Sequence, residues 1–243
     1  MNSSKIVAVL CLMMAFAACQ QEEAKPKKVI YEDEPEEEVV YQKIDSTDVK
    51  IADLPIHLPE TDFLLHPVGD VRVYSNNNSR YGSLKSGNSY SFTVSNYSYP
   101  EITGYMSNLL IQHKDSADLH LLSENRMMIK SIVYLDKLAE QTNKKVLVYQ
   151  VVDRDTNRDG NYDSNDILAL YISTIDGQNF TKLTDEYQEL IDFNVIEAQK
   201  RLYFRSVEDK NKNGAFDSDD KLNYYYVDLN SDNWEKTAYQ PVE

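Results

Sequence analysis

The sequence predicts an all-β fold built from antiparallel repeat units. Runs rich in β-branched and aromatic residues, which favour strands, occur at 146–152, 168–172, 202–204 and 224–227. The pair Asp176-Gly177 between two apolar runs is typical of a two-residue hairpin turn. A third observation is an internal repeat, because residues 149–182 match residues 203–236 at an offset of 54.

The repeat sets the expected organisation of the folded part. The aligned residues outside the Asp-rich centre are Tyr149 with Tyr203, Leu168 with Leu222, Tyr171 with Tyr225, and Phe180 with Trp234. A further copy lies upstream, where residues 109–123 match residues 170–184 at an offset of 61. We therefore expect a β-rich domain at 59–243, with repeats at about 109–152, 167–206 and 221–239.

One unit of this repeat resembles a known architecture. The segment LYISTIDGQNFTKLT at 170–184, in which an Asp-Gly hairpin precedes a Leu-Thr ending, resembles a blade of the TolB-like β-propellers. The resemblance implies a small or incomplete propeller, since a complete one needs at least about four blades. A curled antiparallel sheet is the alternative. Residues 129–135 fit a strand by the repeat and a helix by their apolar spacing, and we expect a strand.

The centre of each repeat carries the pattern D-x-N-x-[DN]-G-x-x-D-x-x-D. The candidate metal ligands are Asp155, Asn157, Asp159, Asn161, Asp163 and Asp166 in the first loop, and Asp209, Asn211, Asn213, Ala215, Asp217 and Asp220 in the second. This is the EF-hand loop spacing: side-chain oxygens at positions 1, 3, 5, 9 and 12, glycine at 6, and a backbone carbonyl at 7. An all-oxygen ligand set favours calcium, so we expect two calcium ions.

The flanks and the last position of each loop indicate structural calcium. Position 12 is Asp instead of the usual Glu, and in this the loops resemble those of dockerin and thrombospondin type 3 modules, which implies structural sites outside cells. A sensor EF-hand opens by reorienting two helices, whereas strands are expected on both sides of these loops. The alternative is a pair of Asp/Asn/Gly-rich turns that bind no metal.

The N-terminus predicts export and a lipid anchor. Lys5 precedes an apolar run at 6–18, which is too short for a bilayer core of about 30 Å and is typical of a signal peptide at 1–18. Its end, Phe16-Ala17-Ala18-Cys19, resembles the lipobox of bacterial lipoproteins, although Phe16 replaces the usual Leu. The resemblance implies acylation of Cys19. An ordinary signal peptide with a chance cysteine is the alternative.

The residues after Cys19 bear on location. The acidic start Gln20-Gln21-Glu22-Glu23 resembles the surface-export signal of some Gram-negative lipoproteins, which implies an outer-membrane protein that could face the exterior. A solvated tail is the alternative. Residues 19–58 combine acidic runs with proline, so we expect a flexible linker there.

Composition excludes several function classes. The net charge of −15, with no basic stripe, argues against a nucleic-acid partner. Both cysteines lie within the first twenty residues, which excludes a cysteine nucleophile or a cysteine-rich zinc site from the folded part. No catalytic motif is present. His113 and His120 lie on either side of the upstream hairpin and could approach each other, but we expect a surface or core role for both. We therefore expect no catalytic residues and no enzyme.

The remaining function classes are a binding or scaffold module, an envelope hydrolase with a site assembled from scattered residues, and a purely structural envelope component. An aromatic platform of Tyr224, Tyr225, Tyr226 and Trp234 would bind a glycan or a peptide. The alternative is that these residues pack the core, because side chains alternate between the two faces of a strand.

The lipid anchor gives the first testable prediction. Cys19→Ala should move the protein from the membrane fraction to the soluble fraction, because no other apolar anchor would remain after cleavage at residue 18. Cys11→Ala, which changes the other cysteine inside the apolar run, is the matched control and should stay with the membrane. A Cys19→Ala protein that resists a high-salt wash of the membranes would show that the anchor lies elsewhere.

Overall fold

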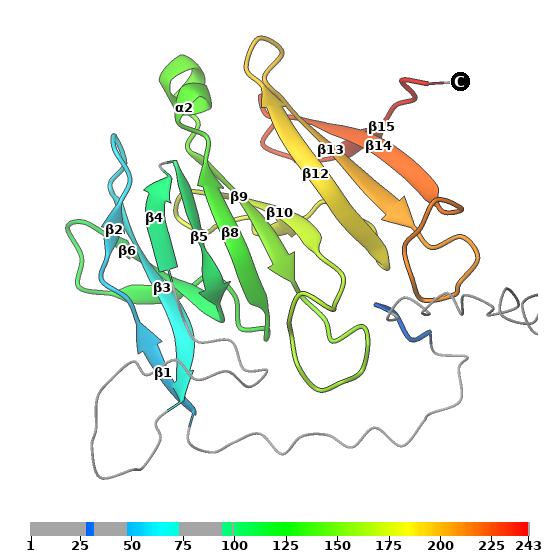
Figure 1. Cartoon of the computed structure of the whole chain (residues 1–243). Helices are drawn as coiled ribbons and strands as arrows, with labels where there is room; N and C mark the ends of the chain where they lie inside the picture. Colours follow the sequence, from blue (N-terminus) through cyan, green and yellow to red (C-terminus); the bar gives the residue numbers. More distant parts are fainter. Residues whose placement is uncertain (1–27, 32–47, 73–93, 99, 243) are drawn as a thin grey trace, which may run out of the picture.

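The computed structural model describes residues 28–31, 48–72, 94–98 and 100–242, so the predicted signal peptide and Cys19 lie outside the described residues. In this part of the chain the fold is all-β, as predicted, with antiparallel strands and one short helix, α2 (Asp136–Thr142). The strands form three sheets (Figure 1), which we call the first, middle and last sheets.

The first sheet has the order β1-β3-β6-β7, with β2 beside β3. Its strands are β1 (Asp48–Ala52), β2 (Ile56–His57), β3 (Phe63–Arg72), β6 (Asn108–His113) and β7 (Leu119–Leu121). The middle sheet, in spatial order, consists of β4 (Val94–Ser98), β5 (Glu101–Met106), β8 (Met128–Tyr134), β9 (Val146–Val152), β10 (Ala169–Thr174) and β11 (Thr181–Lys182). The last sheet runs β12 (Gln188–Ile196), β13 (Arg201–Glu208), β14 (Lys221–Asp228) and β15 (Lys236–Ala238).

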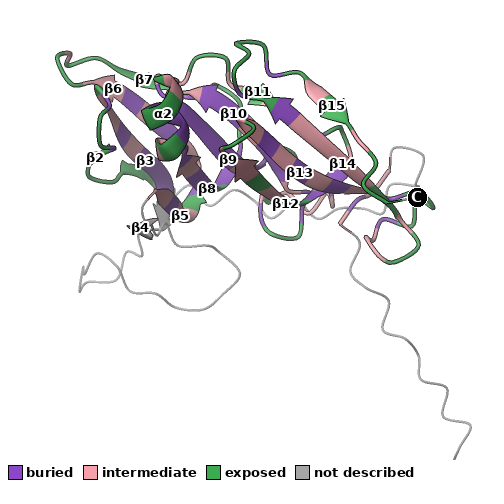
Figure 2. Ribbon diagram, turned by 90° about the horizontal axis from the view of Figure 1, so that it is seen from above, coloured by how far each residue is buried: buried purple, intermediate pink, exposed green. Residues whose placement is uncertain are grey.

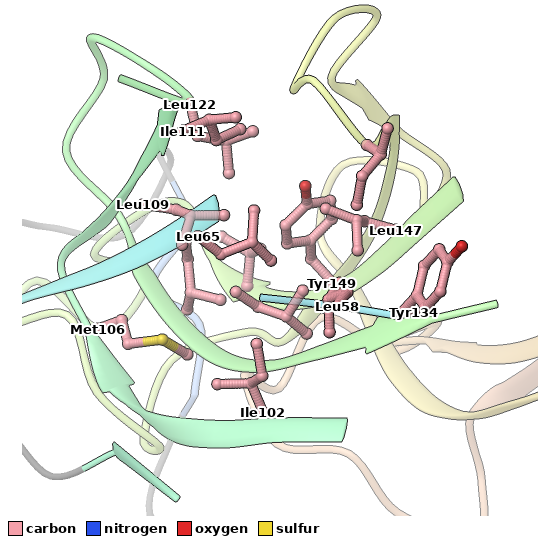
Figure 3. Close-up of a cluster of buried hydrophobic side chains, with 14 of the residues drawn as sticks. Leu58, Leu65, Ile102, Met106, Leu109, Ile111, Leu122, Tyr134, Leu147 and Tyr149 are labelled. Atoms are coloured by element: carbon pink, nitrogen blue, oxygen red, sulfur yellow. The ribbon is translucent and has the colours of Figure 1, made fainter. Parts of the chain in front are cut away.

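The middle sheet is buried on both faces. On β9, Leu147, Tyr149 and Val151 belong to a cluster shared with the first sheet, while Val146 and Val148 belong to a second cluster shared with the last sheet. This double burial explains why 146–152 reads as a nearly continuous apolar run instead of an alternating one. Figure 2 shows the buried residues concentrated on the central strands, and Figure 3 shows Leu147 and Tyr149 facing Leu65 of β3.

Two four-stranded meanders, β8–β11 and β12–β15, are the structural repeat. Each resembles a propeller blade, and each contains one Asp-rich loop between its second and third strands. Both first strands carry a bulge, at Lys130 in β8 and at Ile191 in β12, and these positions are 61 residues apart, as the upstream alignment requires. The predicted repeat at 109–152 combines the hairpin β6–β7 of the first sheet with the hairpin β8–β9 of the middle sheet. The boundaries of the sequence repeat therefore do not coincide with the boundaries of the sheets.

The predicted alignment of Tyr149 with Tyr203 is wrong by one residue. Tyr149 pairs with Tyr171 in the middle sheet, whereas the partner of Tyr225 in the last sheet is Phe204, and Tyr203 pairs with Tyr226. The segment between strand and loop is therefore one residue longer in the first copy. Because a one-residue shift moves a strand's side chains to the opposite face, Phe204 fills the core where Tyr203 was expected.

The linker expected at 19–58 does not extend through its described parts. Residues 48–52 form β1, which pairs with β3 from Asp48 to Ala52, and β2 follows it. Ile56 packs against the core and Leu58 is buried in it. Strand pairing uses backbone groups and does not depend on the acidic side chains of this stretch. For this reason, composition placed the end of the linker too far along the chain, at residue 58. The domain therefore begins by residue 48, and residues 28–31 also contact it.

The ambiguous segment at 129–135 is a strand, as predicted, and its helical spacing continues into α2. Ser131, Ile132 and Val133 pair with β9. Leu138 and Ala139, one turn later, are the buried residues of the helix. The apolar residues therefore belong to two consecutive elements, the strand β8 and the helix α2. This explains why the segment fitted both the strand of the repeat and a helical spacing.

The hairpin between β10 and β11 is wider than the predicted two-residue turn. Asp176 keeps a negative φ and Gly177 has a φ of 76°, while Thr174 N–H donates to Gln178 O over 3.1 Å. This is a three-residue turn ending in a left-handed glycine. The glycine also touches the first sheet, since a Cβ at Gly177 would lie 2.5 Å from Ile111 Cδ1.

Gly177 gives a prediction about the contact between two sheets. Gly177→Ala should lower the free energy of unfolding by about 1–3 kcal/mol, because it combines a strained φ with overpacking against Ile111. Urea unfolding followed by circular dichroism measures the change. Gln178→Ala, at the neighbouring exposed position, is the control and should change stability by less than about 0.5 kcal/mol. Equal stability of the two variants would contradict the contact.

Candidate functional site

The two Asp-rich loops lie at the same end of neighbouring sheets (Figure 1). The first connects β9 to β10 and the second connects β13 to β14. Each predicted side-chain ligand accepts a hydrogen bond from a backbone N–H of its own loop, and these bonds hold both loops in closed turns.

In the first loop, positions 1 and 12 hold the two ends together. Asp155 at position 1 accepts N–H bonds from Asp159 (3.1 Å) and Gly160 (2.8 Å). Asp166 at position 12 accepts from Thr156 N–H over 2.7 Å with Oδ1 and from Asp163 N–H over 3.0 Å with Oδ2. The carboxylate of Asp166 thus joins the start of the loop to its end.

The second loop has the same network. Asp209 accepts from Asn213 N–H (3.2 Å) and Gly214 N–H (2.8 Å). Asp220 accepts from Lys210 N–H (3.1 Å) and Asp217 N–H (2.9 Å). The equivalence was predicted from spacing alone, and here two loops with different residues at several positions adopt one hydrogen-bond pattern.

The backbone conformation is also shared. Position 4 has a positive φ of 57° in both loops, at Arg158 and Lys212. Position 6 has a φ of 85° at Gly160 and 81° at Gly214, which explains the glycine there, since L side chains rarely adopt this conformation.

The middle positions complete the network. Each accepts from the N–H two residues on: Asn157 from Asp159 (3.0 Å), Asp159 from Asn161 (2.8 Å), Asp163 from Asn165 (2.7 Å), Asn211 from Asn213 (2.9 Å), Asn213 from Ala215 (2.8 Å) and Asp217 from Asp219 (2.9 Å). These are Asx turns, which curl the chain so that alternate side chains point into the loop.

The donor chemistry of both loops fits a hard divalent cation. All predicted ligands are carboxylate, amide or carbonyl oxygens, and the first loop has four of the carboxylates against three in the second. Among the described residues, however, no group of three or more His, Cys, Asp or Glu side chains is gathered closely enough to hold a metal ion. Calcium binding at these loops therefore stays a prediction.

The first loop contains the more buried carboxylates. Asp166 is 1% exposed and Asp163 is also buried. Burial raises the pKa of Asp166, while the N–H bonds from Asp163, Thr156 and Asn157 oppose the increase. A cation beside this carboxylate would compensate for the water it has lost. In the second loop, Asp209 is the buried carboxylate.

Sequence analysis missed residues that contact both loops from outside. Lys28 to Tyr31 lie against Gly214 and Thr156, and Val29 is fully buried. A signal was available, because Val29-Ile30-Tyr31 is an apolar and aromatic run within a charged stretch. Overall composition obscured it.

The tyrosines expected to form one platform are divided between two faces of the last sheet. Tyr225 stacks on Phe204 and Trp234 is buried, both on the core side. Tyr224 and Tyr226 lie on the opposite face with Tyr203 and Tyr239. The rings of Tyr203, Tyr226 and Tyr239 lie 5.4–6.1 Å apart between centroids. We call Tyr203, Tyr224, Tyr226 and Tyr239 the tyrosine face.

The two histidines considered as candidates make separate structural contacts. His113 packs edge-on against Phe63, with ring centroids 5.3 Å apart. His120 Nε2 lies 2.9 Å from the backbone oxygen of Asp176, at the contact between the first and middle sheets. The structure therefore gives each ring a contact of its own.

Comparisons with known proteins add little to this description. No protein-family model matches the chain, and no curated protein matches its sequence. A solved structure assigned to TolB of Agrobacterium tumefaciens is similar at 10% identity, covering 77% of this chain and 80% of that one, with a TM-score of 0.21.

The buried carboxylate of the first loop gives a prediction. Asp166→Ala should lower the free energy of unfolding by about 3 kcal/mol even in chelator, because it leaves the N–H groups of Thr156 and Asp163 without their acceptor, at about 1–3 kcal/mol for a buried donor. Thermal and urea unfolding measure the loss.

Asp219→Ala is the matched control for this change. Asp219 is an exposed aspartate at position 11 of the second loop, outside the predicted ligand set, so its replacement should change stability by less than about 0.5 kcal/mol. Similar effects of the two substitutions would mean that the loop network does not hold the fold.

Proposed function

We propose that this chain is a lipid-anchored protein of the bacterial envelope whose β domain is stabilised by two structural calcium ions and serves as a binding or scaffold module. The observation that carries the calcium proposal is the identical carboxylate-to-backbone network in two loops that occupy equivalent places in consecutive meanders. Such agreement is expected if both loops are selected to surround the same kind of ion.

A structural role is favoured over a sensing role. Both loops are flanked by strands, and those strands are fixed in the sheets by continuous pairing. A sensor needs two helices that can change their angle on binding, and paired strands do not offer that motion. The ions would therefore hold the ends of β9–β10 and β13–β14 in one arrangement.

The envelope part of the proposal rests on the N-terminal sequence, namely the apolar run at 6–18 and the lipobox-like end at Cys19. Within the part of the chain that the structure describes, no helix is long and apolar enough to span a membrane. The proposed anchor is therefore the lipid on Cys19, and the outer membrane is the proposed location.

The binding part of the proposal is supported by the tyrosine face. Its four rings lie on the side of the last sheet away from the core, and Arg201 and Arg205 lie beside them. Arg201 stacks over Tyr226 at 4.3 Å from the ring centroid. Aromatic rings with neighbouring polar groups suit a glycan or a peptide ligand.

Calcium titration tests the proposal. Isothermal calorimetry of the full chain in detergent should show two calcium ions bound, with dissociation constants of roughly 10⁻⁴–10⁻³ M, as for extracellular sites. At a calcium concentration one hundred times the dissociation constant, one site would stabilise the fold by about 2.7 kcal/mol, so the melting temperature should fall on chelation.

Single-loop variants sharpen the same experiment. Asp155→Asn and Asp209→Asn should each reduce the stoichiometry to one ion, and magnesium should bind more weakly than calcium because it demands a tighter octahedral site. Asp219→Ala should still bind two ions. The absence of calcium uptake, together with a melting curve that chelator does not change, would leave the loops as plain turns.

A further inference from the structure

A short N-terminal segment, Lys28–Tyr31, lies between the two loops and bonds to both (Figure 1). Lys28 N–H and Val29 N–H both donate to Gly214 O of the second loop, over 2.7 and 3.1 Å. Ile30 N–H donates to Thr156 O of the first loop over 2.9 Å. In return, Thr156 Oγ1 donates to Lys28 O over 2.7 Å. We call this segment the clasp.

The side chains of the clasp are equally engaged. Val29 is 0% exposed. Lys28 Nζ lies 2.7 Å from Glu189 Oε1, and the other oxygen of Glu189 accepts from Leu168 N–H, just after the first loop. Tyr31 donates its hydroxyl to Asp209 Oδ2 over 3.0 Å.

The clasp bonds mainly to groups that lie between the predicted ligands. Gly214 is position 6 of its loop and Thr156 is position 2, and neither belongs to the ligand set. Thr156 N–H, however, holds Asp166 at position 12. Tyr31 bonds to the same Asp209 oxygen that already accepts from Gly214 N–H. The clasp and a cation can therefore be bound together, and each orders the backbone that the other needs.

We propose that the seam between the two loops is a peptide-binding surface whose occupant is the chain's own segment 28–31, and that calcium in the loops and the docked clasp strengthen each other. This inference rests on the proposed calcium sites. Coupling of this kind is reciprocal: calcium raises the affinity for the clasp by the same factor by which the clasp raises the affinity for calcium.

The coupling sets the reach of the proposed tether. With the clasp docked, the chain from Cys19 to Lys28 spans at most about 30 Å, since an extended residue covers about 3.3–3.6 Å. With the clasp released, the next residue along the chain that the structure places is Asp48 of β1, and the chain from Cys19 to Asp48 could span at most about 100 Å. Calcium would then hold the loop end of the domain close to the membrane.

Hydrogen exchange on the full chain in detergent provides the first test. The amides of Lys28, Val29 and Ile30 should exchange slowly in millimolar calcium and at least about tenfold faster in chelator, a factor within the usual range of such couplings. The exposed amide of Leu54, which donates to the side chain of Asp53, exchanges through local opening, so it should be unaffected and serves as the internal control. Equal protection of the clasp amides with and without calcium would overturn the inference.

The reciprocal test measures calcium binding in a clasp variant. Val29→Asp should raise the calcium dissociation constants about tenfold, because a carboxylate cannot occupy the buried site of Val29. Tyr31→Phe, which removes one hydroxyl and is well tolerated sterically, should weaken calcium binding at the second loop in the same direction. Leu54→Asp is the matched control, since Leu54 is 81% exposed and close in sequence, and it should leave calcium binding unchanged.

The outcomes separate the two proposals. Calcium uptake by the wild-type chain that neither Val29→Asp nor Tyr31→Phe changes by more than twofold would overturn the clasp inference and leave the calcium sites standing. No calcium uptake by the wild-type chain would overturn the calcium sites and the coupling with them. A peptide of residues 26–33 that binds the Val29→Asp chain only in calcium would support the seam as a peptide-binding surface.

Discussion

The burial of both faces of the middle sheet is the constraint on which the rest of the structure depends. β9 cannot be solvated on either side, because Tyr149 and Leu147 pack towards the first sheet and Val148 packs towards the last. Two neighbouring sheets are therefore required to cover it. The last sheet differs, since its far face carries tyrosines and charged residues. Strand alternation turns the apolar side chains of β13 towards the middle sheet.

The same layering brings the two loops together. Each follows the second strand of a meander, and neighbouring sheets that stack face to face present equivalent ends to each other. A segment four residues long can then reach Thr156 in one loop and Gly214 in the other. The folded part contains no cysteine, so no disulfide can hold these loop ends. Within the described residues, Asp166 and Asp220 hold them through backbone N–H bonds, and a cation would add to this bond network at the point where carboxylates crowd.

Much of the fold could be predicted because its signals are local. Strand-forming runs, the Asp-Gly turn and the loop spacing are readable within a dozen residues, and the all-β antiparallel class followed from them. The features that sequence missed depend on pairing at a distance. β1 lies in an acidic stretch and is stabilised by backbone bonds to β3, which composition does not reveal. The clasp is one lysine followed by three apolar or aromatic residues, and its partners are more than one hundred residues away in the chain. The loop residues were predicted as calcium ligands from their spacing, and that role stays a prediction. Their shared bonds to backbone N–H groups could not be read from the spacing.

The two copies of the repeat differ by one residue in the length between strand and loop, and this difference decides which side chains of the last sheet face outwards. Five residues separate Tyr149 from Asp155, whereas four separate the equivalent Phe204 from Asp209. This difference places Phe204 rather than Tyr203 in the core position of Tyr149. Tyr203 is consequently turned outwards beside Tyr226 and Tyr239. Had the copies kept one register, the outer face of the last sheet would have lost the ring at its centre. The tyrosine face is therefore produced by the register of β13 and not by the abundance of tyrosine alone, which is why counting aromatic residues identified the wrong set.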